Sequence, residues 1–338
     1  MKVLLTGATS GLGRNAAQYL LEQGHQVVAI GRNHQEGLRL TRLGARFVAL
    51  DLTATTTETL TRLMEGCDAV WHCAAKSSPW GRLSEFYQAN VLVTQMLAEA
   101  AGIAAVPRFI HISTPAVYFD FQHHYAVPET YLARHFSSHY ALTKYQAEQK
   151  IADAVTRFPA TRFTLLRPRG LFGPHDNVIV PRLLQQLHRD KGVLRLPRGG
   201  EALLDLTFVS NVVQAMALAT AAADLPSGSI FNITNHQPQR LVDMLDVLLR
   251  QQLGLRYTVK AVPWSLVSLV ARGMEWAGKW RDKEPAITRY SAGVICFDMT
   301  LSSQKATDEL GYHPLISMAD GIALTGKWLR EHGKNHHF

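Results

Sequence analysis

Short apolar runs alternate with helical patterns through the first half of this chain, and this alternation restricts the folds that it can adopt. Continuous apolar strands that are separated by helices indicate parallel strands covered on both faces. This order is typical of a doubly wound α/β fold of the Rossmann type. The predicted strands occupy residues 2–6, 26–30, 46–50, 68–72, 108–112 and 162–167, and predicted helices between them include 13–24 and 85–102.

The strict alternation loosens after about residue 168, so the second half is predicted to differ in organisation. A helical pattern over 209–222 and a strand pattern over 228–235 are typical of elements that return to the core sheet. The 338 residues suffice for one large α/β unit that carries a second lobe. We therefore predict a dinucleotide-binding domain over 1–170 to which 205–235 returns, and a smaller C-terminal substrate lobe formed mainly by 171–204 and 236–338.

A glycine-rich turn follows the first predicted strand in "VLLTGATSGLGRNAA". Glycines at such a turn allow a tight bend, a close approach of backbone to a pyrophosphate, and close packing of the helix on the sheet. The helix that follows offers free N–H groups and a positive dipole end to the phosphates. The residues of this turn that we expect to bind the cofactor are Gly7, Thr9, Ser10, Gly11, Leu12 and Gly13.

The end of the second strand distinguishes NAD(H) from NADP(H). An acidic residue there binds the ribose 2′-hydroxyl, whereas an arginine accommodates a 2′-phosphate. The stretch "VVAIGRNH" has no acid and carries Arg32, so NADP(H) is favoured; NAD(H) is the alternative if Arg32 only faces solvent. Asp51 and Leu52 follow the third strand, and we expect them beside the adenine. Arg14 is either a second phosphate contact or an exposed side chain.

Tyr140 and Lys144 lie four residues apart in "YALTK", and this spacing places them on one face of a helix. A neighbouring ammonium favours the phenolate and would lower the pKa of the tyrosine. Such a tyrosine can transfer a proton near neutral pH. Ser113 and Thr114 follow the fifth strand, at the edge where ligands bind in sheets of this kind.

Together these stretches resemble the extended short-chain dehydrogenase/reductase family, almost from end to end. The matching segments include "TGATSGLG", "HCAA", "YQANVLVT", "ISTPAVY", "YALTK" and "LRPRGLFGPHD". Within the family the chain is most similar to the 3β-hydroxysteroid dehydrogenase-like branch, and it resembles the bacterial 2-alkyl-3-oxoalkanoate reductases. One departure is the glycine spacing G-x-x-x-G-x-G, which belongs to the shorter members of the family.

The resemblance implies a role for each matching residue. Tyr140 would be the acid/base, Lys144 would tune it and hold the nicotinamide ribose, and Thr114 would hydrogen-bond the substrate carbonyl. Ser113 is the alternative to Thr114, and Trp80 either lines the substrate pocket or only packs a loop. The remaining residues implied to lie along the cofactor are Ala74, Ala75, Asn90, Pro168 and Gly170.

The implied function is the NADP(H)-dependent interconversion of a ketone and a secondary alcohol on an apolar, steroid-like or β-keto acid-like substrate. The first alternative is a nucleotide-sugar epimerase or dehydratase, although such enzymes usually carry an acid after the second strand. The second alternative is a module that senses NADP(H) without turnover, although a sensor needs no acid such as Tyr140. Relatives often form homodimers, so a homodimer is a further expectation.

The charge pattern excludes some partners and leaves one open. A net charge of +8 suits a phosphate-rich cofactor, but the absence of a dense Lys/Arg run argues against nucleic acid. Cysteine spacing and the adjacent histidines of 121–125 give no metal pattern, and we expect 121–125 to be a surface loop. The three cysteines and the lack of a signal-peptide pattern favour the cytosol.

Residues 262–283 combine three tryptophans with basic residues at helical spacing. Three interpretations remain open for this segment: a cap over an apolar substrate, an interfacial helix at a membrane surface, or a helix packed within the lobe. The residues concerned are Trp264, Trp276, Trp280, Arg272, Lys279 and Arg281.

Overall fold

The computed structural model describes residues 1–176, 179–281 and 283–332. The predicted substrate lobe and the segment 262–283 are therefore described without residues 177–178, 282 and 333–338, which lie outside the described residues.

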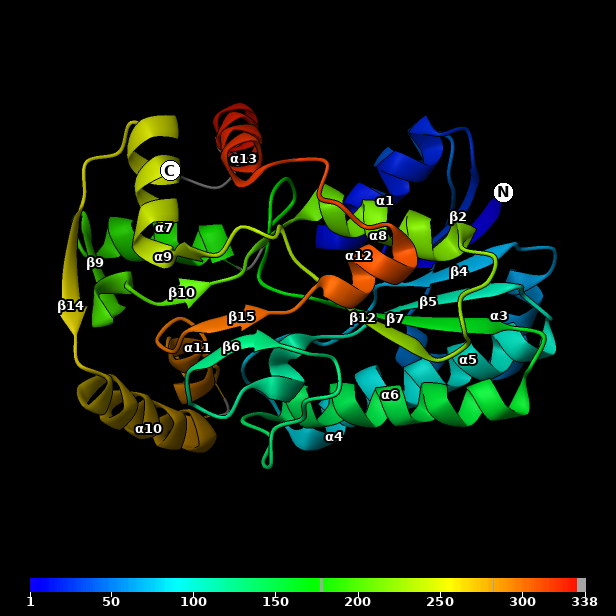
Figure 1. Ribbon diagram of the computed structural model, residues 1–338, viewed down its shortest axis with the longest axis horizontal. Coiled ribbons are helices and arrows are strands. Elements are labelled where there is room, and N and C mark those ends of the chain that lie inside the picture. The colour runs from blue at the N-terminus through cyan, green and yellow to red at the C-terminus, as the bar shows by residue number, and fades with distance from the viewer. Residues whose placement is uncertain (177–178, 282, 333–338) are drawn as a thin grey trace.

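A seven-stranded parallel sheet forms the centre of the larger domain (Figure 1). Its order is β12-β7-β5-β4-β1-β2-β3, so the direction of winding reverses between β1 and β4. Ligands bind at such a reversal, beyond the carboxyl ends of the strands. The strands are β1 (Lys2–Thr6), β2 (Gln26–Gly31), β3 (Arg46–Ala49), β4 (Ala69–His72), β5 (Arg108–Ile112), β7 (Arg162–Pro168) and β12 (Ser229–Ile233).

Helices cover both faces of this sheet, because its strands are apolar on both sides. One face packs against α1 (Gly11–Glu22) and α8 (Val209–Ala221). The other packs against α3 (Thr57–Met64), α5 (Val93–Ile103) and α6 (His139–Arg157). Figure 1 shows the two layers above and below the sheet. A further helix, α2 (His34–Arg42), follows β2. The doubly wound fold predicted from the sequence is confirmed.

The predicted helix over 85–102 is continuous but widens in the middle. It runs from α4 (Leu83–Phe86) through a π-helical segment, η2 (Tyr87–Leu92), into α5. Such widened turns are frequent at functional sites. Here the widened turn carries Asn90, one of the expected cofactor residues.

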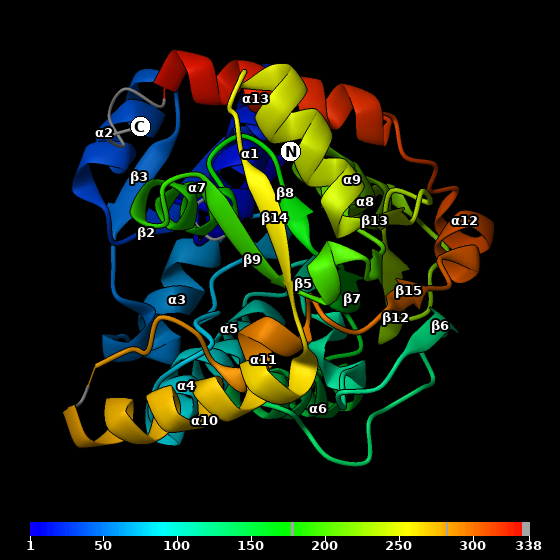
Figure 2. The ribbon, with the colours of Figure 1, turned by 90° about the vertical axis from the view of Figure 1, so that its left-hand side faces the viewer.

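The second lobe stands at the carboxyl edge of the main sheet, as Figures 1 and 2 show. Its own apolar core joins α7 (Ile179–Arg189), β9 (Val193–Pro197), α9 (Leu241–Leu245) and α13 (Met318–His332). The surface loop predicted over 121–125 is confirmed for 121–123, where His123 is exposed, whereas residues 124–127 form β6 (His124–Val127), which pairs with β15 (Met299–Leu301). The lobe also contains η5 (Asp246–Gln252), β14 (Thr258–Val262), α10 (Trp264–Arg281) and α11 (Arg289–Gly293). A small sheet in the order β13 (Gln239–Arg240), β10 (Leu203–Leu204), β15 and β6 completes it. Short elements at its borders are β8 (Leu171–Phe172), β11 (Thr207–Phe208) and α12 (Gln304–Leu310). The residue boundaries of the two domains stay a prediction.

Candidate active site

The turn after β1 is built so that only glycine fits at two of its positions. Gly7 has φ of +69°, and a Cβ there would lie 2.9 Å from the backbone nitrogen of Ala74. A Cβ on Gly13 would lie 2.1 Å from the carbonyl oxygen of Gly7. These contacts bring the start of α1 against the turn and the loop after β4, with Ser10 as the N-cap of α1. The cradle fits the pyrophosphate of a dinucleotide.

The end of β2 has no room for an acidic side chain. A Cβ on Gly31 would lie 2.5 Å from Cγ2 of Thr9. The next residue, Arg32, is exposed and lies 4.0 Å from a carboxylate oxygen of Asp51. Thus the position that binds a ribose 2′-hydroxyl in NAD(H) proteins is filled by Thr9, and a cation stands beside it. Leu52 is buried next to Asp51.

Arg14 is buried at the same end of the sheet, so it is not the exposed side chain that was one of its two predicted roles. Its only ion pair among the described residues is with Glu36, at 3.7 Å. The Nε and Nη1 atoms have no hydrogen-bond partner in the part of the chain that the structure describes. Burial lowers the pKa of the guanidinium, and Glu36 opposes this shift. An unsatisfied buried cation beside the glycine turn fits an anionic cofactor.

Asn90 fixes the loop after β4 to α6, the helix that carries Tyr140 and Lys144. Its Oδ1 accepts from the backbone nitrogen of Lys76 at 2.8 Å, and its Nδ2 donates to the carbonyl of Lys76 at 3.1 Å. The same Nδ2 donates to Oγ1 of Thr143, next to Lys144, at 3.1 Å. Asn90 therefore holds the backbone that follows Ala74 and Ala75. Pro168 ends β7 across the sheet, and Gly170 beyond it has φ of +53°.

Tyr140 stands in the first turn of α6. Ser138 caps this helix by accepting from the backbone nitrogen of Ala141 at 3.1 Å. The expected lowering of the Tyr140 pKa is wrong: burial raises this pKa above its usual value, and the hydrogen bond of Thr114 opposes the shift. The phenol is therefore protonated at neutral pH, which is the form that donates a proton.

Lys144 is almost fully buried one turn further along α6, and its ammonium turns toward β5. Nζ donates to the carbonyl of Ile112 at 2.7 Å and lies 3.2 Å from Nε2 of His111. This geometry explains why Lys144 does not acidify Tyr140. Burial lowers the Lys144 pKa to about 8, while Glu148 raises it. His111 was not singled out in the sequence, because a lone histidine in an apolar strand carries no recognisable signal.

The two hydroxyls after β5 have different partners. Thr114 lies beside the Tyr140 phenol and also accepts from the backbone nitrogen of Ala116 at 3.1 Å. Ser113 instead donates to Glu148, which forms a buried ion pair with Arg167 at 2.5 Å. The geometry favours Thr114 as the substrate-facing hydroxyl, because the proton of Ser113 is engaged within the core.

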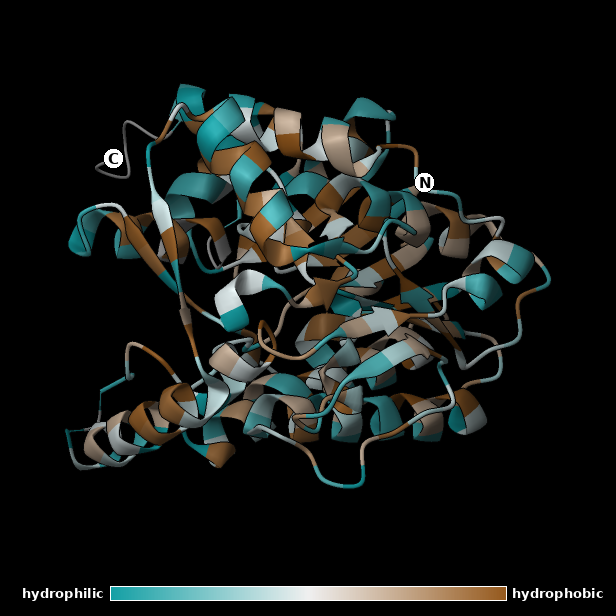
Figure 3. Cartoon of the chain, turned by 60° about the vertical axis from the view of Figure 1, so that its left-hand side comes forward, coloured by the Kyte–Doolittle hydropathy of each residue, from teal (hydrophilic) through white to brown (hydrophobic). Residues whose placement is uncertain are grey.

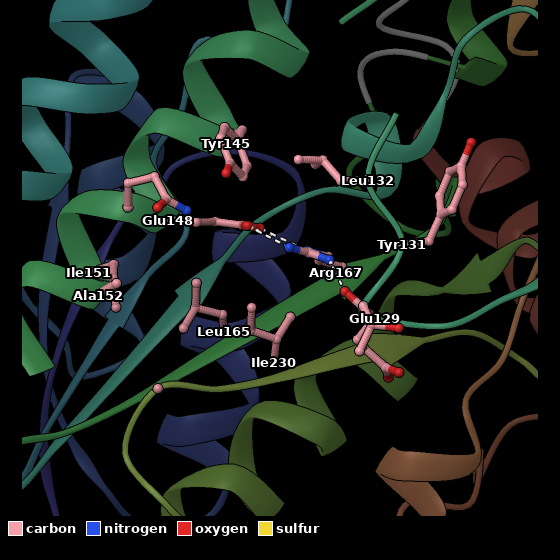
Figure 4. Close-up of a pocket in the computed structure, with 13 residues that line it drawn as sticks. Glu129, Tyr131, Leu132, Tyr145, Glu148, Ile151, Ala152, Leu165, Arg167 and Ile230 are labelled. Atoms are coloured by element: carbon pink, nitrogen blue, oxygen red, sulfur yellow. Dashed lines mark hydrogen bonds and ion pairs between the residues drawn. The ribbon is translucent and has the colours of Figure 1, made fainter. Parts of the chain in front are cut away.

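The Arg167–Glu148 pair lies at a cavity of about 280 Å³ between α6, β7 and the loop 129–132 (Figure 4). Arg167 also donates to the hydroxyl of Tyr118 at 2.6 Å and to the carbonyl of Glu129 at 3.0 Å. The charges at this cavity are thus internally satisfied. Tyr140 and Lys144 do not line the cavity, so it is separate from the candidate active site.

Tyr290 of α11 is a second phenol beside Tyr140, and no sequence motif marks it. Its pKa is raised by burial and then by the adjacent Tyr140, whereas Arg169 opposes the shift. The Tyr290 ring lies 6.1 Å from that of Phe119, which belongs to an aromatic cluster. The other members of the cluster are Phe121, Trp264 and Phe297.

Trp80 packs toward α10, which leaves both of its predicted roles open. A Cβ on Gly278 of α10 would lie 3.3 Å from the Trp80 ring. His139, the residue before Tyr140, lies 3.2 Å from the carbonyl of Gly81 through its Nδ1. The Trp80 loop thus bridges α10 and the first turn of α6.

The described residues contain no group of three or more His, Cys, Asp or Glu that could hold a metal ion. Within the same residues, no helix has the length and apolarity needed to cross a bilayer. What the site can perform is acid–base chemistry at an oxygen beside Tyr140 and Thr114, with a dinucleotide lying across the glycine turn.

Comparison with known proteins shows which family this chain matches. The family model described as "NAD dependent epimerase/dehydratase family" matches residues 3–234. The chain is 43% identical over 336 residues to the uncharacterised protein YbjS of Escherichia coli K12, covering 99% of each chain. It is 30% identical to a 2-alkyl-3-oxoalkanoate reductase of Stenotrophomonas maltophilia, covering 95% of this chain and 97% of the relative.

A solved structure, UDP-glucuronic acid 4-epimerase of Bacillus cereus with UDP-glucuronic acid and NAD, has the same fold. It matches with a TM-score of 0.78 at 23% identity, covering 98% of this chain and 99% of that one. The predicted family, the Rossmann-type fold and the class of NAD(P)-dependent enzyme are confirmed by these comparisons.

Proposed function

Because the chain belongs to the NAD dependent epimerase/dehydratase family, we propose that it is an NADP(H)-dependent ketone reductase acting on an apolar, lipid-like substrate. The observation that carries the proposal is the pair formed by a protonated Tyr140 and the Thr114 hydroxyl at the cofactor edge. The physiological direction can be reduction or its reverse, since the same groups serve both.

The choice of NADP(H) rests on the end of β2. Thr9 fills the space in which an acid would contact the ribose, and the exposed Arg32 is available for a 2′-phosphate. Arg14 adds a buried positive charge near the same edge. Both cations favour a cofactor with an additional phosphate over NAD(H).

The apolar substrate class is supported by the aromatic surroundings of the phenols. Tyr290 lies beside Tyr140 and packs on Phe119. Phe121, Trp264 and Phe297 extend this apolar surface toward α10. Such surroundings suit a steroid-like or β-keto acid-like substrate better than a nucleotide sugar. The similarity to a 2-alkyl-3-oxoalkanoate reductase agrees with this class.

The residues have distinct tasks in the proposed reaction. The nicotinamide, when bound, supplies the hydride. Thr114 and Tyr140 donate hydrogen bonds to the carbonyl oxygen, and Tyr140 gives up its proton as alkoxide charge develops. Lys144, held beside β5 by the Ile112 carbonyl and His111, would hydrogen-bond the nicotinamide ribose through its ammonium. We also propose that the protein is located in the cytosol.

The decisive experiment compares cofactor consumption with cofactor retention. Purified protein is mixed with NADPH or NADH and with β-keto acids, oxosteroids or nucleotide sugars, and absorbance at the nicotinamide band is followed. The proposal expects stoichiometric loss of NADPH with the apolar ketones, at a higher kcat/KM than with NADH. Conversion of a nucleotide sugar without net cofactor loss would instead establish the epimerase alternative.

A further inference from the structure

The helix α10 exposes its large apolar side chains to solvent and turns its small residues inward. Val267, Ser268, Ala271 and Gly278 are its buried positions. The exposed apolar residues follow the three- and four-residue spacing of one helix face. Their exposed fractions are 52% for Leu266, 67% for Leu269, 48% for Val270, 65% for Trp276 and 78% for Trp280.

Contacts with neighbouring elements fix the orientation of α10. Trp264 at its start packs against Phe121 and Phe297. In the middle, Ser268 accepts from Nε of Arg289 at 3.1 Å, and Glu275 accepts from the backbone nitrogen of Arg289 at 2.7 Å. Figures 1 and 3 show α10 at the rim of the molecule, with brown apolar positions along it.

The charges along α10 favour one kind of occupant for this face. The helix contains the basic residues Arg272, Lys279 and Arg281 and a single acid, Glu275, which is bonded to Arg289. Exposed tryptophan and leucine beside lysine and arginine are typical of a helix that lies in the interface of an anionic bilayer. A symmetric contact between two copies would instead bring the same basic residues together, which is unfavourable.

We propose that the apolar face of α10, formed by Leu266, Leu269, Val270, Trp276 and Trp280, docks peripherally on an anionic lipid bilayer. No described helix is fit to span the membrane, so the contact is at the surface. The face lies close to the candidate active site, because α11, which α10 holds through Arg289, carries Tyr290 beside Tyr140. The docking itself is independent of the proposed reaction and is measured without substrate.

The test measures co-sedimentation of the full chain with vesicles of phosphatidylcholine containing phosphatidylglycerol, and with phosphatidylcholine vesicles alone. Binding to the anionic vesicles is expected, and it should weaken at about 0.5 M salt because basic residues contribute. Replacing Trp276→Gln together with Trp280→Gln should lower the partition coefficient by about tenfold or more. Both side chains are exposed, so the unfolding midpoint should not change.

The matched control replaces two exposed apolar residues on other elements, Leu38→Gln and Ile103→Gln, which are 60% and 59% exposed. This variant should bind vesicles like the wild type. The proposal is overturned if the wild type does not sediment with anionic vesicles, or if both double variants bind equally well. It is also overturned if the tryptophan variant changes only the mass in sedimentation velocity, because the face would then be an interface between copies.

Discussion

At the level of single residues, the proposed preference for NADP(H) depends most on Thr9, which fills the space beside Gly31. A Cβ at Gly31 would lie 2.5 Å from Thr9, so Gly31→Asp alone should be poorly tolerated. The double change Thr9→Gly with Gly31→Asp should open the space and add a partner for a ribose 2′-hydroxyl. We expect the ratio of kcat/KM for NADPH over NADH to fall by about 100-fold, or about 2.7 kcal/mol.

Steady-state kinetics with both cofactors measure this ratio, and Thr9→Gly alone is the control. If the single Thr9→Gly variant shifts the ratio as far as the double variant, the proposed role of the position at Gly31 is wrong.

The buried Lys144 predicts how activity depends on pH. Its pKa is lowered to about 8, mainly by burial, so the ammonium is present below pH 8 and is lost as the pH rises. Tyr140 stays protonated over this range because its own pKa is raised. The kcat/KM for reduction reports the free enzyme, and we expect it to fall as the pH rises through about 8.

The neighbour His111 provides a variant that should move this alkaline limb. His111→Leu removes an acceptor of the Lys144 ammonium, which weakens the charged form and should shift the limb to lower pH by about one unit. Thr94→Val is the control, since Thr94 bonds to His72 and not to Lys144. A pH profile of the His111 variant identical to that of the wild type would contradict this account.

At the level of elements, the first turn of α6 places the proton donor. Ser138→Ala removes the side-chain acceptor for the backbone nitrogen of Ala141 and should lower the free energy of unfolding by about 1 kcal/mol. Because Tyr140 lies in that turn, we also expect kcat to decrease by about tenfold. Thermal unfolding and steady-state kinetics measure the two effects.

Ser138→Asn retains a capping acceptor and is the matched control. It should keep both stability and kcat near the wild-type values. Equal losses in the alanine and asparagine variants would show that capping is not what places the tyrosine.

The main elements could be predicted because their signals are local. Apolar runs bounded by turns gave strands such as 2–6 and 108–112 with the ends that the structure has. The widening of the helix at Asn90 could not be predicted, since a π-helical turn depends on the packing of the loop at Lys76. Nor could the strand over 124–127, which forms only because β15 pairs with it from far along the chain.

Within the site, residues next to a strand end or a glycine turn were accessible from the sequence. Tyr290 was not, because it reaches Tyr140 from the second lobe by tertiary packing alone. The direction of the Tyr140 pKa was also not accessible, since spacing places Lys144 on the same helix face but does not show that its ammonium turns to Ile112. Long-range contacts, which spacing cannot show, explain both failures.

At the level of the whole molecule, the two lobes divide the proposed reaction between them. The parallel sheet positions the glycine turn and α6, whereas Tyr290 of α11 reaches Tyr140 from the second lobe and packs on Phe119 of the aromatic cluster. In the proposed reaction, Thr114 and Tyr140 would donate hydrogen bonds to the substrate, and the aromatic rings near Tyr290 would contact its apolar part. This arrangement makes Tyr140 the group on which the proposed chemistry depends.

The most direct measurement is the rate of NADPH oxidation with an apolar β-keto substrate, compared between the wild type and Tyr140→Phe. The phenylalanine keeps the ring and removes only the proton donor. We expect the rate to fall by about 100-fold or more, while the dissociation constant for NADPH, measured by fluorescence titration, changes by less than about threefold. A Tyr140→Phe variant that oxidises NADPH at the wild-type rate would contradict the account.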